Sequence, residues 1–511
     1  MANKGIDWSS LWKKEEWLAV WLGFLIIIIL LFGVTWKAPS MSWTTDGEFM
    51  GFVAERAPLV DKVAKQAEEK GEEGVKAQMA ALKAGIDGKN RKGIGDAAKK
   101  LGDEAKKAKD AGVKKDAGKL SSDIGRQAGR LPEKVFSIDN ILTGVYLGIA
   151  YMILATIAMT FMGVGASKFI VGFPIIFIFS WIALILAGNY TIYEYGLEYV
   201  LWCLIIGLLV SNVIGLPGWL KPAVKTEFFI KTGLVLLGSR VLFGEIIQAG
   251  AYGMVQALLV VGVVWYLCYW IARKFGVDED FSAILASGVS ICGVSAAIAT
   301  SGAIKGDPKK LSYVTSLVLI CAVPMLVLMP LIAKWTGMSD VVAGAWLGGT
   351  LDTSGSVVAA GALISETALK TGVIVKMSQN VLIGVAAFIL AVVWTFREKA
   401  KVGGEKPSAM EIWFRFPKFV LGFMIVSLLF SFYLSPETVK SVGGALRGLQ
   451  TWWFAMAFTC IGLETNFGDL AKLGGGRPAG AFLIAQGFNI LWTLLLAYLL
   501  FGGVLFPAPK L

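Results

Sequence analysis

Histidine is absent from this chain of 511 residues. Its absence excludes histidine metal ligands, histidine general bases and histidine pH switches. Cysteine is scarce: the five cysteines all lie in apolar segments and lack the spacing of metal ligands, so we expect free thiols, no disulfide framework and no metal site. No pairing of a nucleophile with a base is apparent either. The sequence therefore predicts a protein that is not an enzyme and that holds no organic cofactor.

Long apolar runs, by contrast, dominate the chain. Hydrophobic residues make up 56% of the sequence and charged residues 17%, and the mean hydropathy is +0.67. These values predict an all-α polytopic membrane protein whose main partner is the lipid bilayer. The net charge of +11 does not require a nucleic-acid partner, because basic loops set the orientation of membrane proteins.

The first apolar run, residues 17–36, is too long and too bulky at its flanks for a cleaved signal sequence. We interpret residues 1–36 as a retained N-terminal anchor. Lys13 and Lys14 precede the run, which predicts a cytoplasmic N-terminus. Later apolar runs bring the expected total to about 11–13 membrane segments. These runs lie near 138–162, 168–188, 195–215, 226–246, 251–272, 281–304, 311–335, 341–365, 370–396, 416–434, 446–464 and 477–505.

Residues 37–134 have a different composition. They contain 21 Lys and Arg against 16 Asp and Glu, abundant Ala and Gly, and few large apolar side chains. We expect extended helices or partial disorder there, because the apolar content looks too thin for a core. With the preceding span crossing outward, this insert is predicted to be extracytoplasmic. A basic antechamber that concentrates anions is one interpretation, and a solvated spacer or a docking arm for a partner protein is the simpler one.

Residues 135–511 are predicted to form a transporter core with an inverted repeat. The sequence GSRVLFGEI from Gly238 matches GLETNFGDL from Gly462, and the preceding segments, EYVLWCLIIGLLVS and KFVLGFMIVSLLFS, are also alike. An odd number of spans separates the copies, so the copies should be oriented oppositely. Inverted repeats are typical of secondary transporters, whose substrate sites lie at the repeat interface. Arg240 and Glu464 occupy equivalent positions, which suggests either a charge pair across the pseudo-twofold axis or two interfacial residues.

Two stretches, residues 281–305 and 348–365, are rich in Gly, Ser and Thr at membrane depth. Such residues suit helices that pack closely or that break and expose backbone groups to a ligand. We therefore predict two broken or re-entrant helices, and the sequence alone does not distinguish the two forms.

The predicted substrate or ion site lies where these helices break. Asp352 is the only acidic side chain well inside such a stretch, and Lys376 lies in the following span, so we hypothesise that the two form a buried functional pair. A structural ion pair, or a lysine that reaches the interface, is the alternative. Backbone N–H groups at helix N-termini would suit an anion. The remaining candidate ligands are Ser290, Gly293, Ser295, Thr353, Ser354, Ser356 and Asn380.

The segments GSRVLFGEI, SGVSICGVSAAIATSGAIK, SVVAAGALISETALKTGVIVKMSQNVLIG and IGLETNFGDL resemble the bacterial inner-membrane family of sulfate exporters. The resemblance covers about residues 136–505 and implies a relationship to sodium/proton antiporters and bile-acid-type symporters, with crossing broken helices. Lys376 matches a usual lysine of that family. Where such proteins often read His-Glu-Thr-Ala-Gln, this chain has DTSGS from Asp352, so its substrate or coupling ion can differ.

Together these features predict a secondary transporter that moves a small sulfate-like or sulfur-containing oxyanion by alternating access, coupled to protons or sodium. The alternative is a cation/proton antiporter of the same superfamily, with Asp352 as its ion site. A channel or a membrane sensor is less favoured, because no pore ring or signalling domain is apparent. The sequence leaves open whether the protein forms a homo-oligomer.

Overall fold

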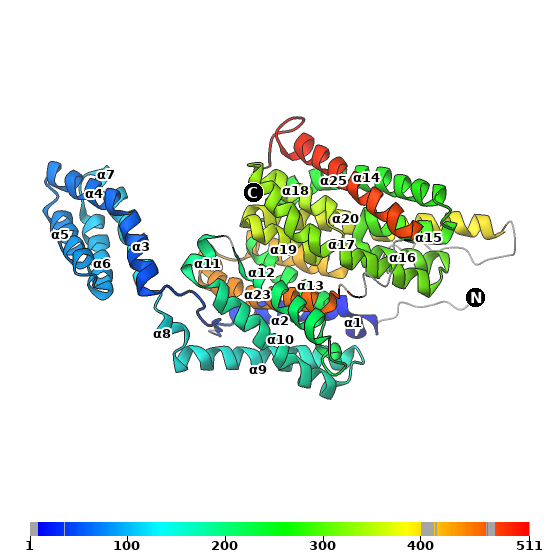
Figure 1. Cartoon of the computed structure of the whole chain (residues 1–511), viewed down its shortest axis with the longest axis horizontal. Helices are drawn as coiled ribbons and strands as arrows, with labels where there is room; N and C mark the ends of the chain where they lie inside the picture. The colour runs from blue at the N-terminus through cyan, green and yellow to red at the C-terminus, as the bar shows by residue number, and fades with distance from the viewer. Residues whose placement is uncertain are drawn as a thin grey trace. The chain divides into compact units, whose positions relative to one another are not determined.

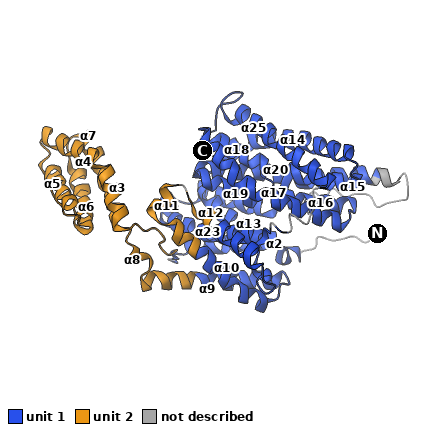
Figure 2. Ribbon diagram, in the orientation of Figure 1, with its two compact units in different colours: residues 1–37, 148–181, 203–511 blue, residues 38–147, 182–202 orange. Residues whose placement is uncertain are grey.

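The computed structural model of the chain describes residues 9–34, 36–195, 197–399, 413, 416–466, 468 and 476–509. All named elements in this part of the chain are helices (Figure 1). They form two compact units (Figure 2). We call them the membrane unit, residues 1–37, 148–181 and 203–511, and the insert unit, residues 38–147 and 182–202. The predicted all-α fold is confirmed.

Seven helical segments in the described part of the chain are long and apolar enough to cross a bilayer, so the chain is a membrane protein with several spans. They are Pro132–Phe161, Ala166–Ala187, Phe243–Lys274, Glu279–Ile304, Pro308–Trp335, Glu366–Trp394 and Arg477–Phe501. Three further apolar segments, Tyr199–Ile214, Ser354–Ile364 and Lys418–Tyr433, are shorter. The predicted total of 11–13 membrane segments also counted shorter apolar segments and segments that need not cross fully.

The membrane unit consists mainly of long helices, and four shorter helices, α15 (Glu279–Ser287), α16 (Gly293–Ile304), α18 (Asp340–Thr350) and α19 (Ser354–Ile364), form the candidate site described below. The other helices of this unit are α1 (Ser10–Lys13), α2 (Glu15–Leu31), α13 (Thr226–Leu237), α14 (Phe243–Lys274), α17 (Pro308–Trp335), α20 (Glu366–Lys399), α22 (Lys418–Leu428), α23 (Pro436–Glu464) and α25 (Arg477–Phe501). Helices α9 (Ile138–Phe161), α10 (Ala166–Ala187) and α12 (Tyr199–Leu209) contribute residues to both units.

Two equivalent glycines of the predicted repeat pack in a similar way. Gly238 follows α13, and Gly462 lies near the end of α23. A Cβ atom on Gly238 would lie 2.5 Å from Phe423 O in α22, and one on Gly462 would lie 2.6 Å from Leu204 O in α12. Each glycine thus packs on the first helix of the other predicted copy. The last residues of the second copy, in 467–475, lie largely outside the described residues.

The insert unit has a hydrophobic core of its own, contrary to the expectation from composition. Helices α3 (Asp46–Glu55), α4 (Ala57–Glu69), α5 (Glu73–Asp87), α6 (Arg91–Lys107) and α7 (Ala111–Ala128) build it, and α8 (Pro132–Val135) and α11 (Tyr190–Glu194) complete the unit. The expectation was wrong because small and medium apolar side chains recur at helical spacing and all face inward. The buried set includes Phe49, Val63, Met79, Leu82, Ile94, Leu101, Leu120 and Ile124.

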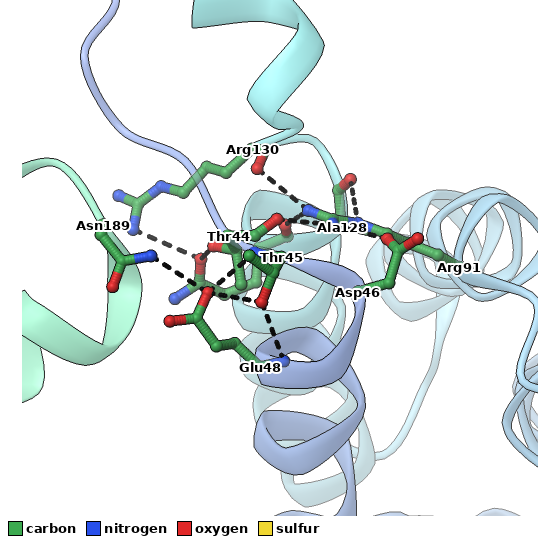
Figure 3. Close-up of polar contacts among 9 residues, drawn as sticks. Thr44, Thr45, Asp46, Glu48, Arg91, Ala128, Arg130 and Asn189 are labelled. Carbon is green, nitrogen blue, oxygen red and sulfur yellow. Dashed lines mark hydrogen bonds and ion pairs between the residues drawn. The ribbon is translucent and has the colours of Figure 1, made fainter. Parts of the chain in front are cut away.

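A buried arginine joins the ends of this bundle (Figure 3). The Arg91 guanidinium donates to Thr44 O (2.7 Å), Gln127 O (3.1 Å) and Arg130 O (3.0 Å). It also pairs with Asp46 Oδ1 at 3.0 Å. The contacts connect the start of α3 with the end of α7, where a cation also suits the negative end of the helix dipole.

Glu48 organises the start of α3 beside this arginine (Figure 3). Its Oε2 accepts hydrogen bonds from Thr45 N (2.8 Å) and Asn189 Nδ2 (3.1 Å). Partial burial opposes ionisation, but hydrogen bonds from Thr191, Thr45 and Asn189 outweigh it and lower the pKa of the Glu48 carboxyl below its ordinary value of 4.5. The ionised carboxylate therefore stabilises the insert unit.

We predict that acid loosens the insert unit through Glu48. A lowered pKa in the folded state gives stability that is present above the ordinary value and is lost as the pH falls through the folded value. The protection factors of α3 amides, which are the ratios of intrinsic to observed hydrogen-exchange rates, should therefore fall between about pH 6 and about pH 3. Glu48→Gln should have lower protection factors at pH 6 that change less with pH, whereas the exposed control Glu133→Gln should behave like the unchanged chain. An identical pH profile for both variants would contradict the prediction.

Candidate functional site

The first small-residue stretch is a broken helix, as predicted. Helix α15 (Glu279–Ser287) continues into a π-helical turn, Gly288–Cys292, and α16 (Gly293–Ile304) then starts in a new direction. Gly293 has a φ of +20°, a backbone conformation that side-chain-bearing residues rarely adopt. The glycine at this position therefore allows the break.

The second stretch is broken as well. Helix α18 (Asp340–Thr350) ends before residues 351–353, and α19 (Ser354–Ile364) begins after them. The Thr353 side chain caps α19 by accepting a hydrogen bond from Ser356 N at 3.1 Å. At this break Thr353 therefore has a structural role, because its side chain starts helix α19.

The two breaks meet inside the membrane unit. A Cβ atom on Gly293 would lie 3.0 Å from Asp352 O and would collide with the Val318 side chain of α17. A glycine therefore lets the backbone of one break approach the backbone of the other. Residues far apart in the sequence form a single centre at this crossing.

Lys376 and Gln379 of α20 satisfy carbonyl groups at the first break. Lys376 Nζ donates to Ile291 O (2.7 Å) and to Gln379 Oε1 (2.9 Å). Gln379 Nε2 donates in turn to Ser290 O at 2.7 Å. Lys376 is only 2% exposed, and its ammonium group is held at the crossing by one backbone carbonyl and one side-chain amide.

Two side-chain amides of α25, Gln486 and Asn489, also donate hydrogen bonds to backbone carbonyls near the breaks. Neither residue was among those predicted from the sequence. Gln486 Nε2 donates to Thr350 O at 3.2 Å, and Asn489 Nδ2 lies 3.4 Å from both Thr350 O and Val289 O. Both side chains are buried. Uncharged polar residues inside an apolar span are the signal that could have identified them.

Several buried polar atoms at the crossing lack a partner. Neither carboxylate oxygen of Asp352 accepts a hydrogen bond from any described residue, although the side chain is 2% exposed. Asn380 Nδ2 donates to Ser354 Oγ at 3.0 Å, while its Oδ1 has no donor among the described residues. A buried polar atom without a partner is costly, which marks these groups as candidates for binding a ligand or a proton.

The predicted hydroxyl ligands fall into two groups. Ser290 Oγ donates to Ala286 O (2.7 Å), one helical turn back, and is fully buried. This bond is the ordinary structural role of serine in a helix. Ser295 and Ser354, in contrast, line a cavity.

Two cavities adjoin the crossing. The larger, about 670 Å³, is lined by the first turn of each half-helix through Val294, Gly355 and Ser356, and by Thr353. The smaller, about 330 Å³, is lined by Cys292, Ser295, Ser354 and Asn380. The N-terminal turns of α16 and α19 therefore face open space, while Asp352 and Lys376 are buried at the crossing.

The two predicted charge pairs differ in outcome. Asp352 and Lys376 both lie buried at the crossing, where their charges interact, although no direct ion pair joins them among the described contacts and the hydrogen bonds of Lys376 go to Ile291 O and Gln379 Oε1. Arg240 and Glu464 do not pair either: Arg240 pairs with Glu366, and Glu464 accepts a hydrogen bond from Thr226 Oγ1 at 2.9 Å. The sequence could not reveal these partners, since they come from distant helices.

Comparison with known proteins finds one family and several bacterial membrane proteins that are similar to this chain. Residues 171–480 match the family described as conserved hypothetical protein 698. A UPF0324 membrane protein of Rhodopirellula baltica is 41% identical over 372 residues, 71% of this chain and 68% of that protein. One of Nitratidesulfovibrio vulgaris is 40% identical over 381 residues, 72% of this chain and 66% of that protein. The UPF0324 inner membrane protein YeiH of Salmonella typhimurium is 28% identical over 309 residues, 59% of this chain and 82% of that protein. No solved structure matches.

We predict that Gly293→Ala destabilises the membrane unit by about 1–3 kcal/mol, because the added methyl group overpacks the crossing. The matched control is Gly487→Ala in α25, where a Cβ atom would meet nothing within 4 Å. The control should be neutral or slightly stabilising, because alanine favours helix. Thermal unfolding of the purified variants in detergent measures both effects. Equal midpoints for the two variants would show that Gly293 is not needed for close packing.

Proposed function

The chain belongs to the family described as conserved hypothetical protein 698, whose compared relatives are bacterial membrane proteins, and on that basis we propose that it is a secondary transporter of a small anion. Two broken helices whose breaks meet inside the membrane unit, together with equivalent glycines that pack reciprocally, fit the pattern of inverted-repeat transporters. The proposal places the substrate site at the crossing of the two breaks.

We choose an anion because carbonyl groups at the breaks have protein donors, whereas the N-terminal turns of α16 and α19 line cavities. At the crossing, Lys376, Gln379 and Gln486 already satisfy backbone carbonyls, which are the groups that would bind a cation. The N-terminal turns of α16 and α19 face the cavities instead. The first N–H groups of a helix have no partner within the helix and carry partial positive charge, so they attract an anion.

The nature of the anion follows from the resemblance to sulfate exporters. A tetrahedral sulfur oxyanion would match the hydroxyls of Thr353, Ser354 and Ser356 together with the N-terminal turn of α19. The Salmonella relative is described as an inner membrane protein. We propose the same location for this chain, with a cytoplasmic N-terminus and an extracytoplasmic insert.

The buried carboxylate of Asp352 favours coupling to an ion. For the same reason a cation/proton antiporter is the second candidate function. A buried carboxylate without a hydrogen-bond partner is stabilised when it binds a proton or a cation. In the anion transporter, the same group would carry the coupling proton. Either way, Asp352 exchanges a proton or a cation during the cycle.

The test of anion transport is counterflow in proteoliposomes that contain the purified protein. We expect preloaded sulfate, sulfite or thiosulfate to drive uptake of labelled sulfate. Lys376→Gln should lower the rate about tenfold or more, because stranding a buried carbonyl costs about 1–3 kcal/mol. The control Lys334→Gln removes an exposed lysine of α17 and should transport normally. If no anion moves but imposed sodium changes the internal pH, the antiporter is the correct function.

Asp352→Asn should separate transport from proton coupling. The amide keeps the shape of the carboxyl but cannot exchange a proton. We expect a proton gradient to accelerate sulfate uptake by the unchanged protein and to have no effect on the variant. Asp340→Asn, at the exposed start of α18, is the matched control and should keep its response. A normal pH response in Asp352→Asn would exclude Asp352 as the coupling group.

A further inference from the structure

A second buried lysine lies in the membrane unit, outside the crossing. Lys231 of α13 is 8% exposed and therefore nearly removed from solvent. Its Nζ contacts Glu15 Oε1 at 2.7 Å and Glu227 Oε2 at 3.5 Å. Glu227 lies one turn earlier on the same helix, whereas Glu15 comes from α2, more than two hundred residues away in the sequence.

This lysine and the predicted ligands line the same cavity. The smaller cavity, about 330 Å³, is lined by the charged side chains Lys14, Lys231, Glu15, Glu16 and Glu227 and also by Ser295, Ser354 and Asn380. The unpartnered atom of Asn380 is Oδ1, a hydrogen-bond acceptor, so it does not attract an anion. The groups that can donate to an oxyanion are the buried Lys231 ammonium and the two serine hydroxyls, and the Glu15 carboxylate already accepts from Lys231.

Helix α2 holds Glu15 at this position. A Cβ atom on Gly23 would collide with the Val235 side chain, so α2 packs tightly on α13. Glu16 Oε2 accepts a hydrogen bond from Lys418 N at 2.8 Å, which fixes the first turn of α2 on α22. These contacts of α2 place the Glu15 carboxylate beside Lys231.

We propose that Lys231 is a binding residue for the transported oxyanion, and that the Glu15 carboxylate occupies the place of that oxyanion in the state described here. The inference rests on the proposed anion transport. A cation is not the occupant, because the position between the Glu15 and Glu227 carboxylates is filled by Lys231 Nζ. Substrate and Glu15 thus compete for one lysine. Residues 9–31 lie before the family match at 171–480, so this competitor is supplied from outside the matched region.

The experiment compares Glu15→Gln with the unchanged protein in sulfate counterflow. Gln keeps the length of the side chain and removes its charge. We expect the KM for sulfate to fall about three- to tenfold, because apparent affinity rises with the fraction of protein whose site is free. Glu437→Gln removes an exposed carboxylate from the first turn of α23 and should leave KM unchanged. Lys231→Gln should raise KM, and Glu15→Gln combined with Lys231→Gln should give no better KM than Lys231→Gln alone.

The outcomes separate this inference from the proposed function. Stabilisation by sulfate in thermal unfolding provides a second readout, and Lys231→Arg, which keeps the charge, serves if Lys231→Gln does not fold. Sulfate transport with the same KM in Glu15→Gln and the unchanged protein overturns the inference and leaves anion transport standing. An unchanged protein that neither binds nor moves sulfate, sulfite or thiosulfate overturns the proposed function, and the inference with it.

Discussion

A peptide group at membrane depth has no water to bond with, so every break in a helix there must find its hydrogen bonds inside the protein. The membrane unit meets this requirement twice at one place. Lys376 and Gln379 approach the first break from α20, and Gln486 and Asn489 approach the second from α25. Polar side chains occur in these otherwise apolar helices because they supply hydrogen bonds to the backbone at the breaks. The position of α20 and α25 against the crossing follows from the same requirement.

The same contacts divide the crossing into two kinds of surface. Carbonyl groups are enclosed by protein donors, whereas the first turns of α16 and α19 remain open toward cavities. One carboxylate, Asp352, is enclosed without a donor. The first turns of the two helices contribute partial positive charge at this site, and Asp352 is an ionisable group within it. In the proposed transporter, such a division would let one centre bind a solute and respond to a coupling ion through different atoms.

The sequence located the breaks because they depend on local chemistry. Gly293 at a positive φ and Thr353 at a helix start are requirements of the residues themselves. The hydrogen-bond partners could not be predicted, because they are contributed by distant helices: Lys376 was expected to interact with Asp352, and its bond to Ile291 O was not foreseen. Similarly, composition suggested no core for the insert, since it cannot show that modest side chains such as Ile94 and Leu101 all face one way.

One of the five cysteines gives the crossing an experimental use. Cys292 is the last residue before Gly293 and lines the smaller cavity, while Cys203, Cys268 and Cys460 are buried elsewhere in the helices. A thiol is thus already present beside the break, in the wall of the cavity. Cys321 is more exposed than Cys292 and would react as well, so the measurement requires its replacement. In a chain without Cys321, the rate of alkylation of Cys292 would report how open the smaller cavity is.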